Sequence, residues 1–95
     1  MERNYEIMFI ARPNLEDEAR KELVDYLTSV LTEQKAEITK VEDLGLRNLA
    51  YEIEDFRKGY YYVINTKAPV GAIQEFDRLV RINENIIRYI IVKEE

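Results

Sequence analysis

Hydrophobic residues change their spacing along the chain, and each spacing predicts a different element. The first apolar run, residues 5–10, is short, rich in β-branched and aromatic side chains and followed by Pro13 and Asn14, which predicts a strand and a stop. Downstream, apolar residues recur at the intervals of one buried helical stripe. This stripe consists of Leu23, Val24, Leu27, Val30 and Leu31.

The first helix is expected to begin at Asn14, whose side chain can cap it, with Asp17 three residues later as a variant of the capping box. Glu16, Asp17 and Glu18 also suit the positive end of a helix dipole. Because consecutive helical positions point in different directions, dipole stabilisation explains these carboxylates better than a metal site does.

The next apolar residues predict a long β-hairpin with an irregular first strand. Residues 38–46 favour extended structure, but the apolar positions shift from even numbers at Leu44 and Leu46 to odd numbers further on. Gly45 is the natural place for a bulge, since one inserted residue reverses which side chains face the core. Residues 54–59 then predict a polar turn ending in Gly59, and residues 60–64 predict a strand.

A second helix and a final strand complete the chain. Pro69 suits the first turn of the helix, in which Ile73, Phe76 and Val80 share one face, and residues 86–92 predict the strand. The order βαββαβ predicts an α+β fold, the ferredoxin-like split βαβ sandwich, with a four-stranded antiparallel sheet and both helices on one face. Three of its strands are apolar at both parities, so the uncovered face is expected to meet a partner.

Composition narrows the class of protein. With 95 residues, 46% of them hydrophobic, the chain is expected to form a single domain spanning residues 1–95. It has no cysteine, so we expect neither disulfides nor thiolate metal sites, and the cytoplasm is the default localisation. No apolar run approaches the roughly 20 residues that span a bilayer, so no membrane association is expected.

Candidate chemistry is sparse. The chain has no histidine, which removes the commonest general base and the commonest metal ligand. Its three glycines are isolated, so there is no glycine-rich phosphate loop. We therefore expect no catalytic residue, no metal, no cofactor and no small-molecule substrate.

The net charge of −5 argues at first against nucleic acid, because phosphate binding depends on Lys and Arg. The excess acid is confined to residues 14–43, however, and residues 44–95 carry eight acidic and eight basic residues. A local basic edge is therefore compatible with an acidic protein, although these cations can equally form a solvated edge without a ligand. Residues 60–62, three consecutive tyrosines, can likewise either stack on unpaired bases or simply pack.

One segment carries a specific resemblance. Residues 45–53 read Gly-Leu-Arg-Asn-Leu-Ala-Tyr-Glu-Ile, and residues 58–61 read Lys-Gly-Tyr-Tyr. With these motifs, and with residues 3–6, 13–15 and 81–92, the chain resembles bacterial small-subunit ribosomal protein number six.

The resemblance implies a protein of the small-subunit platform that pairs with ribosomal protein eighteen, contacts the central domain of 16S rRNA and has no enzymatic role. It also implies that Arg3, Arg47 and Arg88 approach the RNA, with Lys58 and Arg81 as further candidates. The leading hypothesis is a structural rRNA-binding protein of the cytoplasmic ribosome whose affinity depends on protein eighteen, because its net charge disfavours RNA binding alone. The alternative is a ferredoxin-like homodimer that buries its spare sheet face and acts as a small-molecule-binding or sensor domain.

Overall fold

A computed structural model describes residues 2–94 and contains six elements in the predicted order. The four strands are β1 to β4, and the two helices are α1 and α2. Their bounds are β1 Glu2–Ala11, α1 Asp17–Glu33, β2 Glu37–Ile53, β3 Phe56–Pro69, α2 Val70–Arg81 and β4 Ile86–Glu94. Within this described part, no helix has both the length and the apolar character needed to cross a membrane.

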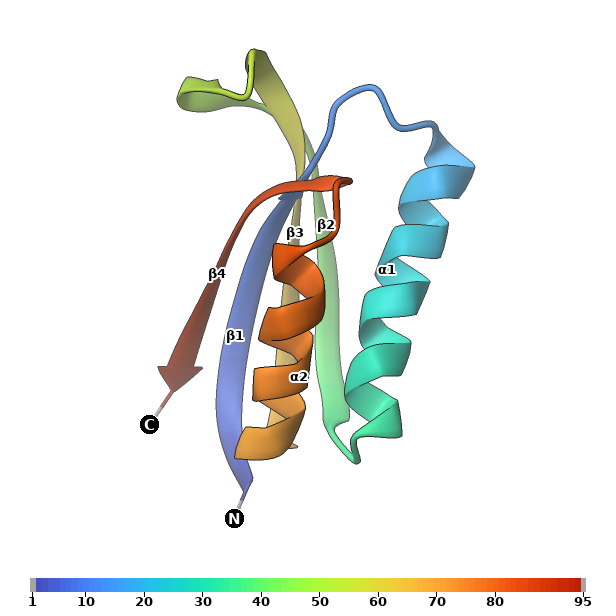
Figure 1. Ribbon diagram of the computed structural model, residues 1–95, viewed down its shortest axis with the longest axis vertical. Helices are drawn as coiled ribbons and strands as arrows, with labels where there is room; N and C mark the ends of the chain where they lie inside the picture. Colours follow the sequence, from blue (N-terminus) through green and yellow to red (C-terminus); the bar gives the residue numbers. More distant parts are fainter. Residues whose placement is uncertain (1, 95) are drawn as a thin grey trace.

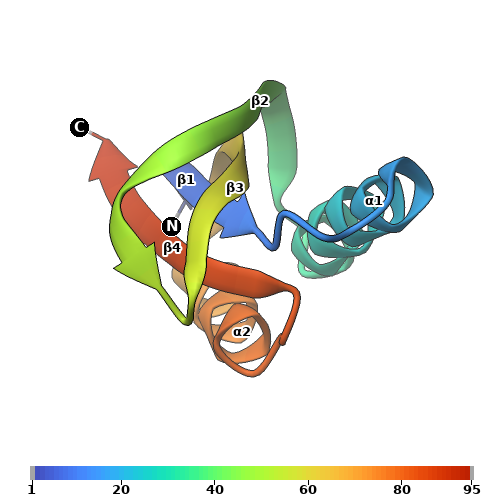
Figure 2. The same cartoon turned by 90° about the horizontal axis from the view of Figure 1, so that it is seen from above.

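The strands form one antiparallel sheet in the order β2-β3-β1-β4 (Figure 1). Each helix connects two parallel strands that have a third strand between them, β1 to β2 and β3 to β4. Right-handed crossovers of this kind place both helices on the same face, as Figure 2 shows. The predicted α+β, ferredoxin-like arrangement is confirmed.

The core lies between the helices and one face of the sheet. Ile7 and Phe9 of β1 are completely buried, and the Phe9 ring stacks on Tyr62 of β3 with ring centroids 5.1 Å apart. Both helical stripes pack against them, and Leu27 of α1 and Phe76 of α2 are also completely buried. The predicted stripes are therefore confirmed, with Val24 and Ile73 partly buried at their margins.

The beginning of α1 differs from the prediction. The helix starts at Asp17, and the residue before it, Glu16, makes no side-chain capping bond. Asn14 lies instead in a turn, in which the amide of Leu15 donates a hydrogen bond to the carbonyl of Arg12 at 3.4 Å. The capping prediction is wrong because this turn reverses the chain after β1 and must be completed before the helix can begin.

The predicted bulge at Gly45 is confirmed. Asp43 pairs with Tyr62 and Gly45 pairs with Tyr61, so Leu44 is an extra residue in β2. Gly45 has a φ of +80°, a conformation that residues with a Cβ adopt only at a cost. Its amide donates a hydrogen bond of 2.9 Å to the carboxylate of Asp43, which closes the bulge.

The turn of the long hairpin is shorter than predicted. Glu54 and Asp55 alone form it, with φ values of 49° and 69° that are typical of a two-residue hairpin turn. Gly59 already lies within β3 and is buried, so the predicted turn over residues 54–59 is wrong at its end. Gly59 is a packing residue rather than a turn residue, because a Cβ at this position would overlap the side chain of Ile10.

The second sheet face is only partly uncovered. Ile90 and Val92 of β4 lie on it and are 55% and 44% exposed. Ile10 and Val63 face the same way but are buried, because they lie on the two central strands among larger neighbours. The apolar surface available to a partner therefore lies towards the β4 edge.

Candidate nucleic-acid interface

Arg88 lies on β4, on the sheet face away from the helices, opposite Ile10 of β1. Its Nη1 donates a hydrogen bond to the hydroxyl of Tyr51, and its guanidinium carbon lies 5.5 Å from the centre of the Tyr51 ring. Within residues 2–94, no carboxylate lies within 4.0 Å of this guanidinium. Because a guanidinium has five N–H donors, most of them remain available to an anion.

Arg47 and Lys58 lie on the two strands of the long hairpin, at the same end of the sheet as Arg88. Arg47 pairs with Gly59, which faces the same side as Ile10, so Arg47 and Arg88 share a face. The Nε of Arg47 donates to a backbone carbonyl of the preceding bulge at 3.1 Å. Lys58 is exposed but points to the other face, because successive strand residues alternate.

The arginines of α2 are engaged by carboxylates. Arg81 donates from Nη2 to Asp77 at 2.9 Å, and Tyr89 together with Asp77 raises the pKa of Arg81. Arg78 contacts both carboxylate oxygens of Glu75, at 2.7 and 3.0 Å. Arg81 lies close to β4, but Asp77 balances its charge, so it is a weaker candidate for binding phosphate than Arg88.

Arg3 lies at the opposite end of the sheet. Arg3 is seven residues before Ile10 on β1, and Ile10 is paired with Arg88 on β4. Seven residues of a strand span about 23 Å, so Arg3 is separated from the level of Arg88 by about that distance along the sheet. The structure therefore brings Arg47, Lys58 and Arg88 to one end of the sheet, here called the hairpin-end cluster. Arg3 is not part of it.

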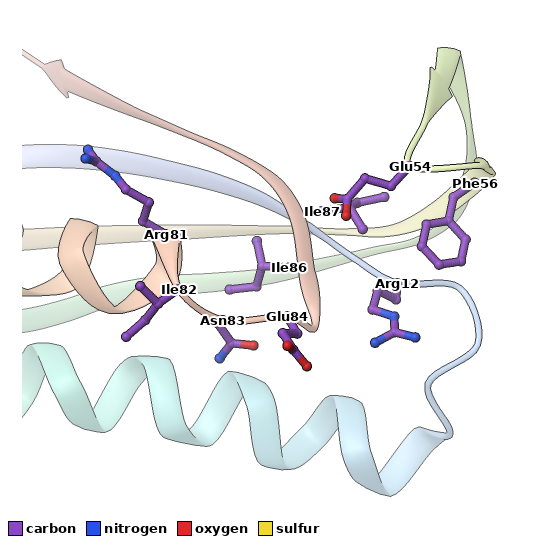
Figure 3. Close-up of a pocket in the computed structure, with 9 residues that line it drawn as sticks. All are labelled: Arg12, Glu54, Phe56, Arg81, Ile82, Asn83, Glu84, Ile86 and Ile87. Carbon is purple, nitrogen blue, oxygen red and sulfur yellow. The ribbon is translucent and has the colours of Figure 1, made fainter.

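Arg12, which follows β1 and lies beside the turn of the hairpin, is a cation that the sequence analysis did not single out. The guanidinium carbon of Arg12 lies 5.8 Å from the centre of the Phe56 ring, and its Nε is buried without a hydrogen-bond partner in the described part of the chain. Figure 3 shows Arg12 in a pocket of about 450 Å³ that Glu54 and Glu84 also line, while the Arg81 side chain points away from it. The two carboxylates make this pocket unsuitable for an anion.

Tyr51 is the second residue that the sequence analysis missed. It belongs to the nine-residue motif of residues 45–53, but the motif does not reveal its contact with Arg88, which lies 37 residues later. Only the path of the hairpin brings the two side chains together.

The three consecutive tyrosines do not form one platform. Tyr62 is buried in the core, and burial raises the pKa of its hydroxyl. Tyr60 faces the same way, and the guanidinium carbon of Arg20 lies 3.7 Å from the centre of its ring. Tyr61 alone lies on the face of Arg88, so packing accounts for the other two.

The described residues contain no group of three Asp or Glu side chains arranged to hold a metal ion. The candidate surface consists of the cations Arg47 and Arg88 with the Tyr51 ring, and such a surface is suited to binding phosphates through charge and hydrogen bonds.

Comparisons with known proteins agree on one family. The family model described as ribosomal protein S6 matches residues 4–93. A curated relative, the small ribosomal subunit protein bS6 of Halalkalibacterium halodurans, is 56% identical over 93 residues, which cover 98% of each chain.

Solved structures support the same fold. The crystal structure of the 30S ribosomal protein S6 of Thermotoga maritima matches with a TM-score of 0.94 and 38% identity, over 99% of this chain and 89% of that one. The P2 domain of the chemotaxis kinase CheA, in complex with the response regulator CheY of Thermotoga maritima, matches with a TM-score of 0.67 over 99% of this chain and 100% of its own. At 14% identity, this second match concerns the fold alone.

Proposed function

The chain belongs to the ribosomal protein S6 family of the small ribosomal subunit, and we propose that its task there is to bind the central domain of 16S rRNA together with ribosomal protein eighteen. This is a family of ribosomal structural proteins rather than of enzymes, and its members work in the cytoplasmic ribosome. The proposal concerns what the chain contacts within the subunit.

The observation that carries the proposal is the hairpin-end cluster. Arg47 and Arg88 lie on the same sheet face at the same end of the molecule, and neither has a carboxylate within 4.0 Å in the described part of the chain. Cations of this kind attract phosphates and release counterions from RNA. Lys58 and Arg81 extend the basic surface around the edge, and Arg3 would contact a separate part of the RNA.

The charge distribution supports the proposal that a protein partner takes part in RNA binding. The excess acid of residues 14–43 falls on α1 and on the first half of β2, and α1 lies on the sheet face opposite to Arg47 and Arg88. The field of the whole molecule therefore opposes RNA binding, while the local cations favour it. A partner that contributes further contacts would shift this balance.

The first experiment measures the affinity of the chain for a central-domain fragment of 16S rRNA, with and without ribosomal protein eighteen. We expect weak binding alone and much tighter binding with the partner. Tight binding that is unchanged by protein eighteen would contradict the cooperative part of the proposal. No binding under either condition would contradict all of it.

The second experiment tests the residues. Arg47→Ala and Arg88→Ala should each weaken the ternary complex and lower the magnitude of its salt slope by about 0.7 to 0.9 for each phosphate that is no longer bound. The matched control is Arg78→Ala, because Glu75 already balances Arg78. A residue whose removal leaves the salt slope unchanged does not bind phosphate, and an equal effect of the control would indicate a general charge effect.

The homodimer remains as the second candidate because Ile90 and Val92 expose apolar surface at the β4 edge. Sedimentation of the purified chain distinguishes the two functions. A stable dimer without affinity for rRNA would favour a small-molecule-binding or sensor domain, and a monomer that binds rRNA with protein eighteen would favour the ribosomal function.

A further inference from the structure

The contact between Tyr51 and Arg88 joins the tip of the hairpin to the opposite edge strand of the sheet. We propose that Tyr51 is a positioning residue that holds the Arg88 guanidinium in place to receive an RNA phosphate. The inference rests on the proposed function, because it concerns how Arg88 meets RNA. It assigns a role to a tyrosine that carries no charge of its own.

The hairpin has an irregularity that delivers Tyr51 to this position. Asn48 pairs with Lys58, and the next pair is Ile53 with Phe56, so the β2 side contains three more residues than the β3 side between these pairs. Extra residues on one strand of a ladder bend that strand and increase its twist. Figure 2 shows the hairpin curving across the sheet towards β4, which is what brings Tyr51 to Arg88.

The arrangement leaves Arg88 free to bind an anion. The Tyr51 hydroxyl accepts a hydrogen bond from one N–H of the Arg88 guanidinium, and the guanidinium carbon lies 5.5 Å from the centre of the Tyr51 ring. Because the tyrosine side chain is uncharged, neither interaction neutralises the charge of Arg88. Arg78 and Arg81, by contrast, each donate to a carboxylate. Of these three arginines, Arg88 alone is held by an uncharged side chain.

An arginine side chain has many rotamers, and binding a phosphate must restrict them. A contact that already restricts them in the free protein lowers this entropic cost and so raises the affinity. Tyr51 is 60% exposed, so burial of its own ring cannot explain the contact as core packing.

This role predicts a signature that distinguishes Tyr51 from a phosphate-binding residue. Removing Arg88 lowers both the affinity and the salt slope, because one phosphate is no longer neutralised. Removing Tyr51 should lower the affinity without changing the salt slope, because the number of ionic contacts stays the same. A merely structural role would change neither quantity once the fold is intact.

The experiment measures binding to the central-domain fragment, with ribosomal protein eighteen present, at several salt concentrations. We expect Tyr51→Leu to weaken binding by about 3- to 10-fold, and Tyr51→Phe, which keeps the ring, by about 2- to 3-fold. Tyr51→Leu should have no further effect in the Arg88→Ala background. The matched control is Tyr26→Leu, which removes a tyrosine of 44% exposure from α1.

A measurement without RNA accompanies these assays. The NMR signal of the Arg88 Nε–Hε group should shift in Tyr51→Leu, because the ring no longer lies over the guanidinium, and circular dichroism should show that the variant is folded. An unchanged Arg88 signal would overturn the inference, since the contact would not exist in solution.

Two binding results would also overturn it. One is an affinity loss in Tyr51→Leu that persists in full when Arg88 is already alanine, and the other is a salt slope that falls as it does in Arg88→Ala. If the unmodified chain binds no rRNA with protein eighteen, the proposed function fails, and the positioning role fails with it. If the unmodified chain binds but the Tyr51 variants bind equally well, the inference alone fails.

Discussion

Gly59→Ala tests the packing of the long hairpin against β1. A Cβ at this buried position would overlap the Cγ2 methyl of Ile10 and approach the carbonyl oxygen of Ala11 to 3.2 Å. The backbone oxygen cannot turn away, and Ile10 is itself buried, so relief requires a shift of β3 relative to β1. The substitution is therefore expected to destabilise the fold although it adds a single methyl group.

The magnitude follows from the kind of contact. Overpacking a close-packed site costs about 1–3 kcal/mol, which exceeds the stabilisation that alanine gains over glycine from a less flexible unfolded chain, about 0.4–1 kcal/mol. The net destabilisation should be about 1–2 kcal/mol. In a domain of this size, each kcal/mol lowers the melting temperature by about 4–8 °C.

Urea denaturation monitored by circular dichroism measures this destabilisation directly. Gly71→Ala is the matched control, because no atom lies within 4 Å of a Cβ at Gly71 and alanine is the better helix former, so it should be neutral or stabilising. Ile10→Ala is itself destabilising because Ile10 is buried, but Gly59→Ala should cost less in that background, since the methyl that the new Cβ meets has been removed. The double-mutant cycle should therefore give a favourable coupling of about 0.5–3 kcal/mol.

Two outcomes would refute the reasoning. If Gly59→Ala is as stable as the unmodified chain, the strands do not approach as closely as described. If it is destabilised equally in the presence of Ile10 and of Ala at position 10, the destabilisation comes from the backbone conformation of residue 59 and not from the contact.

Two further predictions concern the bulge and the core. Gly45→Ala should destabilise the fold by about 1–2 kcal/mol, because the position has a positive φ; the space around it is open, so no overlap adds to this cost. Gly45→Asn should destabilise it less, because Asn tolerates this conformation. Equal midpoints of the two variants in urea denaturation would contradict the role of φ. Burial raises the pKa of the Tyr62 hydroxyl, so the folded state favours its neutral form. The resulting contribution to the free energy of unfolding is complete below the pKa of about 10 that Tyr has in the unfolded chain. It disappears as the pH rises through the higher pKa of the folded state. Ultraviolet titration of the seven tyrosines should show one group that ionises late, and Tyr62→Phe should remove that group; a titration curve unchanged by the substitution would assign the late group elsewhere.

Much of the fold could be read from local patterns. The stripe of α1 and the face of Phe76 and Val80 in α2 follow from apolar spacing, because a helix that must bury one side repeats every 3.6 residues. The bulge at Gly45 follows from a change of parity, because strand residues alternate between faces. These signals depend on residues close together in the chain, so they predict the elements correctly without knowledge of the tertiary contacts.

The wrong predictions concern residues whose type suits two different local structures or whose role depends on a contact distant in the sequence. Asn14 has the right side chain for a helix cap, but the turn after β1 places it outside α1. Gly59 resembles a turn residue, but its role depends on Ile10, which is remote in the sequence and adjacent in the sheet. Composition and local preference cannot distinguish these cases, because each residue type suits both roles.

The candidate surface divides in the same way. The sequence was enough to identify the available cations and, through the motif of residues 45–53, the family to which the chain belongs. Strand register and side-chain contacts were needed to show that Arg47 and Arg88 share a face, that Arg3 lies about 23 Å from their end, and that Asp77 balances Arg81. The physical reason is that an arginine binds phosphate according to its neighbours in space, and strand register and hairpin bending choose those neighbours.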